Sequence, residues 1–143
     1  MGLKIDSSYN SIKVLKGNNE VLLFKGNTIG MESYKGDTEL KEVDILEGVK
    51  TISIGAFQDC TSLTKVTIPA SLKRIEWNAF AGCSALKEMV LPASLNEVDC
   101  CVGRGVTKMT LFNPSSDEII KNLKQGYAID LYYKGDSHGD HWN

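Results

Sequence analysis

The strongest constraint on this chain is an apolar pattern that recurs after 23 residues. Residues 52–74 read ISIGAFQDCTSLTKVTIPASLKR, and residues 75–97 read IEWNAFAGCSALKEMVLPASLNE. The two segments agree at their Ala-Phe, Cys, Leu and Pro-Ala-Ser-Leu positions. A fixed period of about 20–50 residues is typical of solenoids, in which each unit buries its apolar side only against its neighbours. We therefore predict a stack of coils whose equivalent residues lie above one another and share one core.

The period continues on both sides of these two copies. Residues 28–50 align with residues 51–73 without a gap, and residues 98–111 follow the pattern with three residues missing. The deletion falls near Gly103-Arg104-Gly105, which we interpret as a tightened turn because a nucleotide-binding loop needs a third glycine and a following helix. The sequence therefore predicts about four to five short coils.

Each coil contains one segment with the alternation of a β-strand. In one copy, Val66 and Ile68 are expected to face the core. Lys65 and Thr67 alternate with them and are expected to face outward. Pro69 follows and ends the strand, because proline has no N–H to donate. Stacked coils would pair their equivalent strands in parallel, about 4.8 Å apart.

The motif A-F-x-x-C-x-x-L-x-x-V-x-I-P-x-S-L-x-x-I over residues 49–98 resembles the repeat of the BspA-like leucine-rich repeat family, and residues 20–48 and 99–113 resemble it more weakly. The resemblance implies a right-handed leucine-rich repeat solenoid of the α/β class, rich in β-structure, with a parallel concave sheet. It also implies a bacterial binding module, often at the cell surface, with no catalytic residues. A non-enzymatic protein is therefore expected.

The two ends of such a stack must be covered. The predicted single domain, residues 1–143, consists of an N-terminal hairpin cap (1–27), the repeats (28–113), a helix–strand C-terminal cap (114–134) and a flexible tail (135–143). Gly17-Asn18-Asn19 predicts the turn of the hairpin, and we expect the second hairpin strand to form the first rung of the main sheet. Ile119, Ile120 and Leu123 form one apolar helical face, after which a parallel strand is expected.

Composition excludes several classes of protein. The net charge of −2 argues against nucleic-acid binding, which usually requires a basic surface. No segment approaches the roughly 18 apolar residues of a membrane span. The first residues lack the apolar centre of a signal peptide, so a cytoplasmic location is expected, or a secreted or cell-surface one if a signal has been removed. Cys60 and Cys83 occupy equivalent positions and are expected to be packed thiols rather than half-cystines or zinc ligands.

Outward residues of the main sheet should form columns across the coils. The column Glu42, Lys65, Glu88, Lys108 alternates in charge, so we interpret it as a control of strand register. One neighbouring column is predicted to be Asp44, Thr67, Val90, Thr110, Asp130, and the next Leu46, Pro69, Pro92, Phe112, Tyr132. The candidate partner-binding residues are Asp44, Thr67, Val90, Thr110, Phe112, Asp130 and Tyr132. Exposed apolar groups with a polar rim are typical of recognition surfaces, although Phe112 and Tyr132 could instead pack beneath the capping helix.

Other polar and aromatic residues give weaker signals. Trp77 shares a column with Ile54 and Cys100 on the return side of the coil, where it either seals a seam or binds a ligand. His138 and His141 lie in the tail, where nothing rigid would orient them around a metal. We therefore expect no metal and no cofactor. The sequence favours a non-catalytic module that binds another protein. The alternatives are an adhesin or carbohydrate-binding fragment, an intracellular inhibitor or scaffold, and an enzyme that uses the tail histidines.

Overall fold

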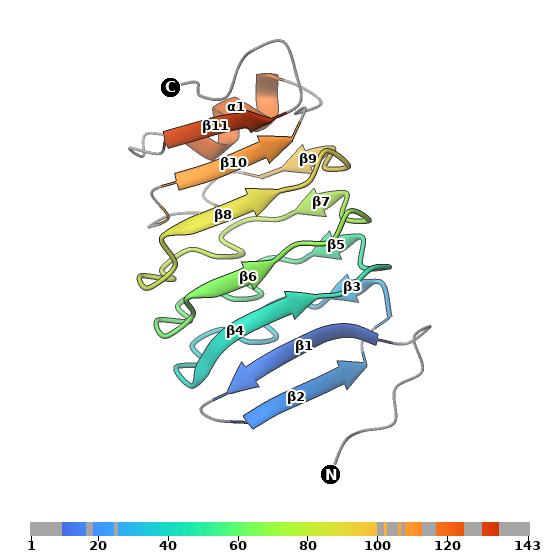
Figure 1. The fold of residues 1–143 in the computed structure, drawn as a ribbon, viewed down its shortest axis with the longest axis vertical. Helices are drawn as coiled ribbons and strands as arrows, with labels where there is room; N and C mark the ends of the chain where they lie inside the picture. Colours follow the sequence, from blue (N-terminus) through green and yellow to red (C-terminus); the bar gives the residue numbers. More distant parts are fainter. Residues whose placement is uncertain are drawn as a thin grey trace.

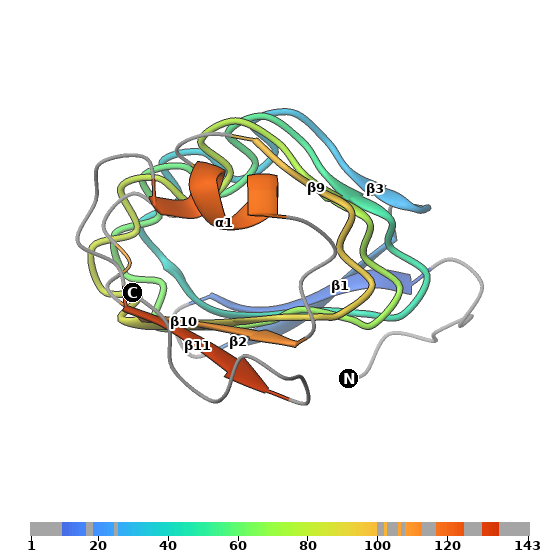
Figure 2. The ribbon, with the colours of Figure 1, turned by 90° about the horizontal axis from the view of Figure 1, so that it is seen from above.

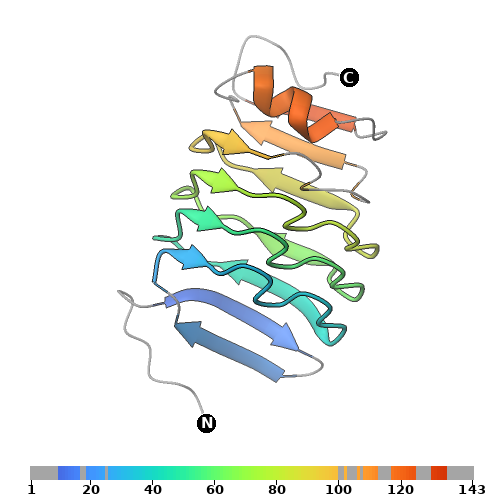
Figure 3. The same ribbon diagram turned by 180° about the vertical axis from the view of Figure 1, so that it is seen from behind.

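Successive turns of the chain stack along one axis, with a long strand on one side of each turn and a short strand on the other (Figures 1 and 3). The computed structural model describes residues 10–16, 19–24, 26–99, 102, 106, 108–112, 117–124 and 130–134. The long strands of the repeats are β4 (Leu40–Ile45), β6 (Lys65–Thr67), β8 (Glu88–Leu91) and β10 (Lys108–Phe112). The short return strands are β3 (Thr28–Ile29), β5 (Thr51–Ile52), β7 (Arg74–Ile75) and β9 (Glu97–Val98).

Equivalent residues lie above one another, as the period predicts. The return strands form one parallel sheet in the order β3-β5-β7-β9, in which Ile29 pairs with Ile52, Ile52 with Ile75 and Ile75 with Val98. All four of these side chains are buried. The predicted solenoid and its shared core are therefore confirmed.

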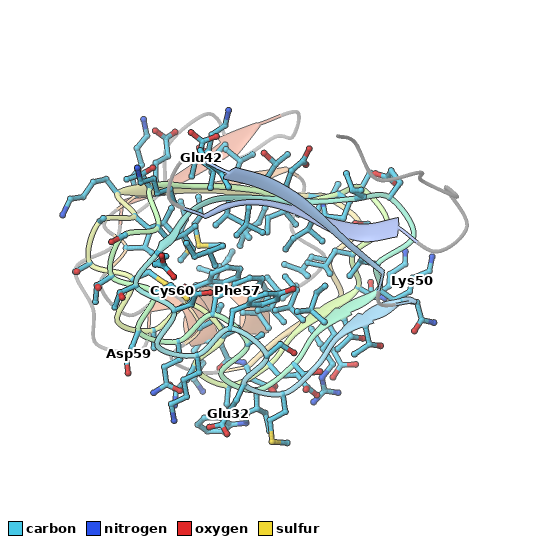
Figure 4. All side chains as sticks on the ribbon, turned by 90° about the horizontal axis from the view of Figure 1, so that it is seen from below. Glu32, Glu42, Lys50, Phe57, Asp59 and Cys60 are labelled. Atoms are coloured by element: carbon cyan, nitrogen blue, oxygen red, sulfur yellow. The ribbon has the colours of Figure 1, made fainter. Side chains whose placement is uncertain are left out.

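Aromatic rings fill the widest part of this core. The Phe57 ring stacks between those of Tyr34 and Phe80, with centroid distances of 5.3 Å and 5.2 Å and interplanar angles of 4° and 6°. Phe57 and Phe80 are fully buried, and Figure 4 shows Phe57 pointing into the middle of the coil. Because the rings repeat at the same position in successive coils, they form a continuous column along the axis of the stack.

The repeated cysteine and serine residues link each coil to the preceding one. Cys60 Sγ donates to the Tyr34 carbonyl and Cys83 Sγ to the Phe57 carbonyl, both at 3.1 Å. Ser71 Oγ donates to the Val49 carbonyl at 2.8 Å, and the equivalent Ser94 Oγ donates to the Leu72 carbonyl at 2.7 Å. The serine hydroxyls therefore give the carbonyls of Val49 and Leu72 a partner. The carbonyls of Tyr34 and Phe57 also accept from the backbone N–H groups of Asp37 and Cys60.

The main sheet is interrupted between β6 and β8. Glu42 pairs with Lys65 in the β4–β6 ladder, and Glu88 pairs with Lys108 in the β8–β10 ladder. No ladder joins β6 to β8, although both strands lie wholly within the described residues. The parallel strands thus belong to two hydrogen-bonded sheets rather than the one sheet expected from the repeat (Figure 1).

The N-terminal hairpin consists of β1 (Asn10–Lys16) and β2 (Asn19–Phe24). The expectation that its second strand forms the first rung is wrong, because β1 pairs with β4 in antiparallel orientation and β2 lies at the edge. Val14 is in register with Val43, and Ile12 with Ile45. β1 alternates over Ile12, Lys13 and Val14, whereas β2 is continuously apolar from Val21 to Phe24, so the pattern did not show that β1 would be the inner strand.

The other end of the stack is covered by α1 (Asp117–Lys124), as Figure 2 shows. Its residues Ile119, Ile120 and Leu123 are buried, and Asn122 Nδ2 donates to the Val98 carbonyl at 2.9 Å. The chain then forms β11 (Asp130–Lys134), which is parallel to β10. The predicted helical face and parallel strand are confirmed. The predicted flexible tail, residues 135–143, lies outside the described residues.

Candidate binding surfaces

The coil presents two opposite surfaces that carry outward side chains. Figure 4 shows Glu42 on the side of the main sheet and Glu32 on the return side, with Phe57 and Cys60 between them in the interior. We call the first surface the main-sheet face, meaning the outward residues of β4, β6, β8 and β10.

The structure brings four candidate residues together on the main-sheet face. Asp44 is in register with Thr67, and Val90 with Thr110, so these pairs form the predicted column on either side of the sheet interruption. Val90 is 44% exposed, and Thr67 is also exposed. Thr110 pairs with Val90 and so occupies the predicted column, but it is only 8% exposed and contributes little to the accessible surface.

The register of β11 differs from the prediction by two residues. Tyr132 pairs with Thr110, and Asp130 pairs with Lys108. Asp130 therefore extends the alternating charge column, whereas Tyr132 extends the column of Val90. Phe112 pairs with Lys134 instead of Tyr132. The repeat could not determine this register, because the segment between β10 and β11 has no equivalent in the preceding coils. The side chains of Phe112 and Tyr132 are outside the described part of the structure, so their packing beneath the capping helix stays a prediction.

A groove of about 430 Å³ lies where the ladder between β6 and β8 is missing. It is lined by Thr64, Lys65, Val66, Thr67, Ile68, Glu88 and Val90. Val66 and Ile68 also pack against the core, so the floor of the groove is apolar and its sides are polar. Sequence reasoning found Thr67 and Val90 but missed the groove, since nothing in the repeat indicates a broken ladder.

The charge column beside the groove is only partly paired. Glu88 Oε1 lies 3.7 Å from Lys108 Nζ. Lys65, which the repeat places next to Glu88, forms no ion pair with any described residue. The predicted self-neutralising ladder thus leaves one lysine at the groove free to meet an anionic group. An exposed pair such as that of Glu88 and Lys108 contributes roughly 0–1 kcal/mol.

The return side carries an exposed apolar column. Met31, Ile54 and Trp77 occupy equivalent positions in successive coils and are 63%, 38% and 50% exposed, and we call them the return-side column. The residue after each has a positive φ: 54° at Glu32, 61° at Gly55 and 57° at Asn78. Trp77 is half-exposed, which fits either role expected from the sequence, sealing a partly exposed seam or binding a ligand. Cys100, which was predicted to share the column of Ile54 and Trp77, lies outside the described residues.

An arginine with three carboxylates borders this column. Arg74 Nε lies 3.1 Å from Glu76 Oε2, although the two atoms are not aligned as a hydrogen bond. Arg74 Nη1 donates to Glu97 Oε2 at 3.0 Å, and Nη2 lies 3.5 Å from Asp99 Oδ2. Glu76, Asp99 and Arg74 were not among the candidate residues from the sequence. Glu97 follows Arg74 by one repeat, and that spacing could have revealed the pair.

The described residues offer little for catalysis or metal binding. No three His, Cys, Asp or Glu side chains in the described ranges gather as they would around a metal ion. Burial raises the pKa of the Cys60 thiol to about 11 and that of Cys83 to about 12, which makes both poor nucleophiles. His138 and His141 lie outside the described part, and none of its helices has the length and apolar character of a membrane span.

Comparisons with known proteins identify the repeat. A family model, the BspA type leucine-rich repeat region, matches residues 20–122 with six copies. A search of curated proteins finds no match. A leucine-rich repeat protein from Bacteroides ovatus is similar with a TM-score of 0.58 and 24% identity, covering 85% of this chain and 28% of that one. A leucine rich cell surface protein from Faecalibacterium prausnitzii gives a TM-score of 0.63 at 18% identity, with coverages of 78% and 31%.

A further solved structure, a leucine-rich repeat protein from Bacteroides capillosus, has a TM-score of 0.55 and 24% identity and covers 85% of this chain and 72% of its own. This chain spans less than a third of the length of the B. ovatus and F. prausnitzii proteins. At these identities the likenesses support the fold alone. Because the family model covers more than half of the chain, the chain belongs to the BspA-type leucine-rich repeat family.

Proposed function

We propose that the chain is a non-catalytic module that binds another protein through the main-sheet face. Leucine-rich repeat proteins generally serve as protein-interaction or surface modules, which supports binding as the function. The observation that carries the proposal is the groove between β6 and β8, with the exposed Val90 at its side.

The groove combines the features of a recognition site for a protein side chain. Val66 and Ile68 supply apolar surface at its floor, and Thr64 and Thr67 supply hydroxyl groups. Lys65 adds a cation that no described residue neutralises. An apolar centre with a polar rim is typical of protein interfaces, and a pocket of this size accommodates a large side chain. We therefore expect a partner segment that places an aliphatic or aromatic side chain against Val90 and a carboxylate near Lys65.

The test begins with crosslinking and affinity capture from the source organism, after which the purified partner is titrated by calorimetry. The variant Val90→Glu introduces a charge into the groove and should weaken binding at least tenfold, because a desolvated, unpaired charge is costly at an interface. The control Lys73→Glu changes an exposed residue away from the groove and should bind like wild type. A folded Val90→Glu protein with wild-type affinity would rule out this face.

A cell-surface adhesin or carbohydrate-binding module is the second candidate. Its support is the similarity to the F. prausnitzii protein, which is described as a cell surface protein. Limited proteolysis of intact cells, followed by detection with an antibody to this chain, distinguishes the locations. Cleavage on intact cells would favour the surface module. Cleavage only after lysis would favour an intracellular inhibitor or scaffold in the cytoplasm.

A further inference from the structure

We infer that the return-side column is a second docking surface, for a protein segment that carries aliphatic side chains next to lysine or arginine. Large exposed apolar residues in the described part are Met31, Ile54, Trp77 and Val90, and the first three of them share this column. A repeated apolar column on a surface away from the main sheet has no role in the core or in the proposed main-sheet site. Contiguous exposed apolar groups typically mark an interaction surface.

The column is held rigidly by the backbone of adjacent coils. Glu32 N–H donates to the Ile54 carbonyl at 2.9 Å, and Gly55 N–H donates to the Trp77 carbonyl at the same distance. These bonds join Ile54 and Trp77 to the turn of the preceding coil. A partner would therefore meet a preorganised surface and would lose little free energy to ordering the column.

Charge complementarity identifies the partner as cationic. Around Arg74, one guanidinium faces the carboxylates of Glu76, Glu97 and Asp99, which leaves a net charge of −2 beside Trp77. Each carboxylate contacts Arg74 through one oxygen, and its other oxygen has no partner among the described residues. These oxygens are free to accept from a lysine or arginine of a bound segment.

The remaining charges near the column do not cancel this acidic end. At the other end Glu32 is paired with Lys35 at 3.0 Å, so that end is neutral. Figure 4 shows Lys50 at a different corner of the coil from Glu32. Lys73 occupies the equivalent position one coil further along and forms no ion pair with a described residue. The column is therefore an apolar strip with one acidic end and one neutral end.

This pattern also disfavours other occupants. A second copy docked column to column would present only Lys35 and Arg74, which are already paired with carboxylates. An anionic membrane would be repelled by the acidic end. A carbohydrate would gain from Trp77, but Met31 and Ile54 offer no aromatic face for further sugar rings. A cationic, aliphatic protein segment satisfies both the apolar strip and the carboxylates.

The experiment uses the fluorescence of Trp77 in the full chain. The chain has two tryptophans, so Trp142→Phe leaves Trp77 as the reporter. The probe is the blocked peptide Lys-Leu-Lys-Leu-Lys, and the matched probe replaces each lysine with glutamate. We expect a saturable blue shift of Trp77 emission with the lysine probe, a loss of the shift in high salt, and no shift with the glutamate probe.

Three variants in this background locate the binding. Ile54→Ser removes apolar surface from the column and should weaken binding of the lysine probe. Glu97→Gln removes the most exposed of the three carboxylates and should weaken binding of the lysine probe by up to about fivefold. Val90→Glu, on the opposite surface, should leave it unchanged. Equal shifts with both probes, no shift at all, or wild-type binding by folded Ile54→Ser and Glu97→Gln would overturn the inference. A dimer in sedimentation that Ile54→Ser abolishes would assign the column to a second copy and would also overturn it.

Discussion

At the scale of single residues, the buried thiols connect packing to pH. Cys60 and Cys83 are fully buried, and each donates to a carbonyl of the preceding coil. A thiolate at either position would lose this hydrogen bond and its solvation, so the neutral thiol is strongly favoured. The repeated cysteine is thus explained by its size and its weak donor rather than by reactivity.

This burial predicts a loss of stability at alkaline pH. The pKa of Cys60 is raised from 9.0 to about 11, and that of Cys83 from 9.0 to about 12. Since the raised values belong to the folded state, the stabilisation is complete below pH 9 and is lost as pH rises toward 11–12. Urea unfolding at pH 10.5 should show a free energy of unfolding lower by about 1–2 kcal/mol per thiol than at pH 8.

The double variant Cys60→Ala/Cys83→Ala provides the control. Its free energy of unfolding should be lower at pH 8, because two core side chains are truncated. The free energy of unfolding of the variant should nevertheless fall less steeply between pH 8 and pH 10.5. Part of the fall that remains is expected from Tyr34, because burial raises the pKa of its hydroxyl to about 12. An equally steep decline in wild type and variant would contradict the role of the thiols.

At the scale of elements, the repeat determined what could be predicted. The strands β5 to β8 were recognisable because inward and outward residues recur at matched positions in two nearly identical coils. The order of β1 and β2 and the register of β11 could not be predicted. Neither the N-terminal nor the C-terminal end of the stack has a repeated counterpart that would fix its strand pairing. The main-sheet interruption depends on backbone spacing, which side-chain patterning does not encode. The sequence therefore predicted which residues of the candidate site share a column, but it did not predict the groove.

The serine in the Pro-Ala-Ser-Leu turn gives a prediction about coil stacking. Ser71 Oγ accepts from Gly48 N–H at 2.9 Å and donates to the Val49 carbonyl at 2.8 Å, so one hydroxyl joins two coils. Ser71→Ala should lower the free energy of unfolding by about 1–3 kcal/mol, because it leaves both backbone groups without their partner. Chemical denaturation monitored by circular dichroism measures the change.

A nearby substitution separates the hydrogen bonds from general sensitivity of the turn. Ala70→Ser changes the exposed neighbour without removing either bond of Ser71 and should alter the stability by less than about 0.5 kcal/mol. If Ser71→Ala were as mild as Ala70→Ser, the hydroxyl would not be a significant link between the coils.

At the scale of the whole molecule, most contacts join a coil only to its neighbours. The Tyr34–Phe57–Phe80 column, the return sheet and the thiol bonds all connect adjacent coils. Because each coil contacts mainly the adjacent coils, the stability of such a stack is approximately a sum of coil and interface contributions. The two proposed binding surfaces lie on opposite sides of the same coils, so one stack could hold two partners at once.

The capping helix should therefore protect the nearest coils more than the distant ones. Leu123 is a buried residue of α1, and this helix contacts β9. Leu123→Ala should cost about 2–5 kcal/mol locally, because it leaves a cavity between the helix and the end of the stack. Hydrogen exchange read by mass spectrometry should show that β9 exchanges faster in the variant than in wild type, with little change in β4 and β5 at the other end.

The control Lys121→Ala changes an exposed residue of the same helix and should leave all these exchange rates near those of wild type. Uniform acceleration from β4 to β9 would instead mean that the stack unfolds as a single cooperative unit, and that its stability cannot be divided among coils.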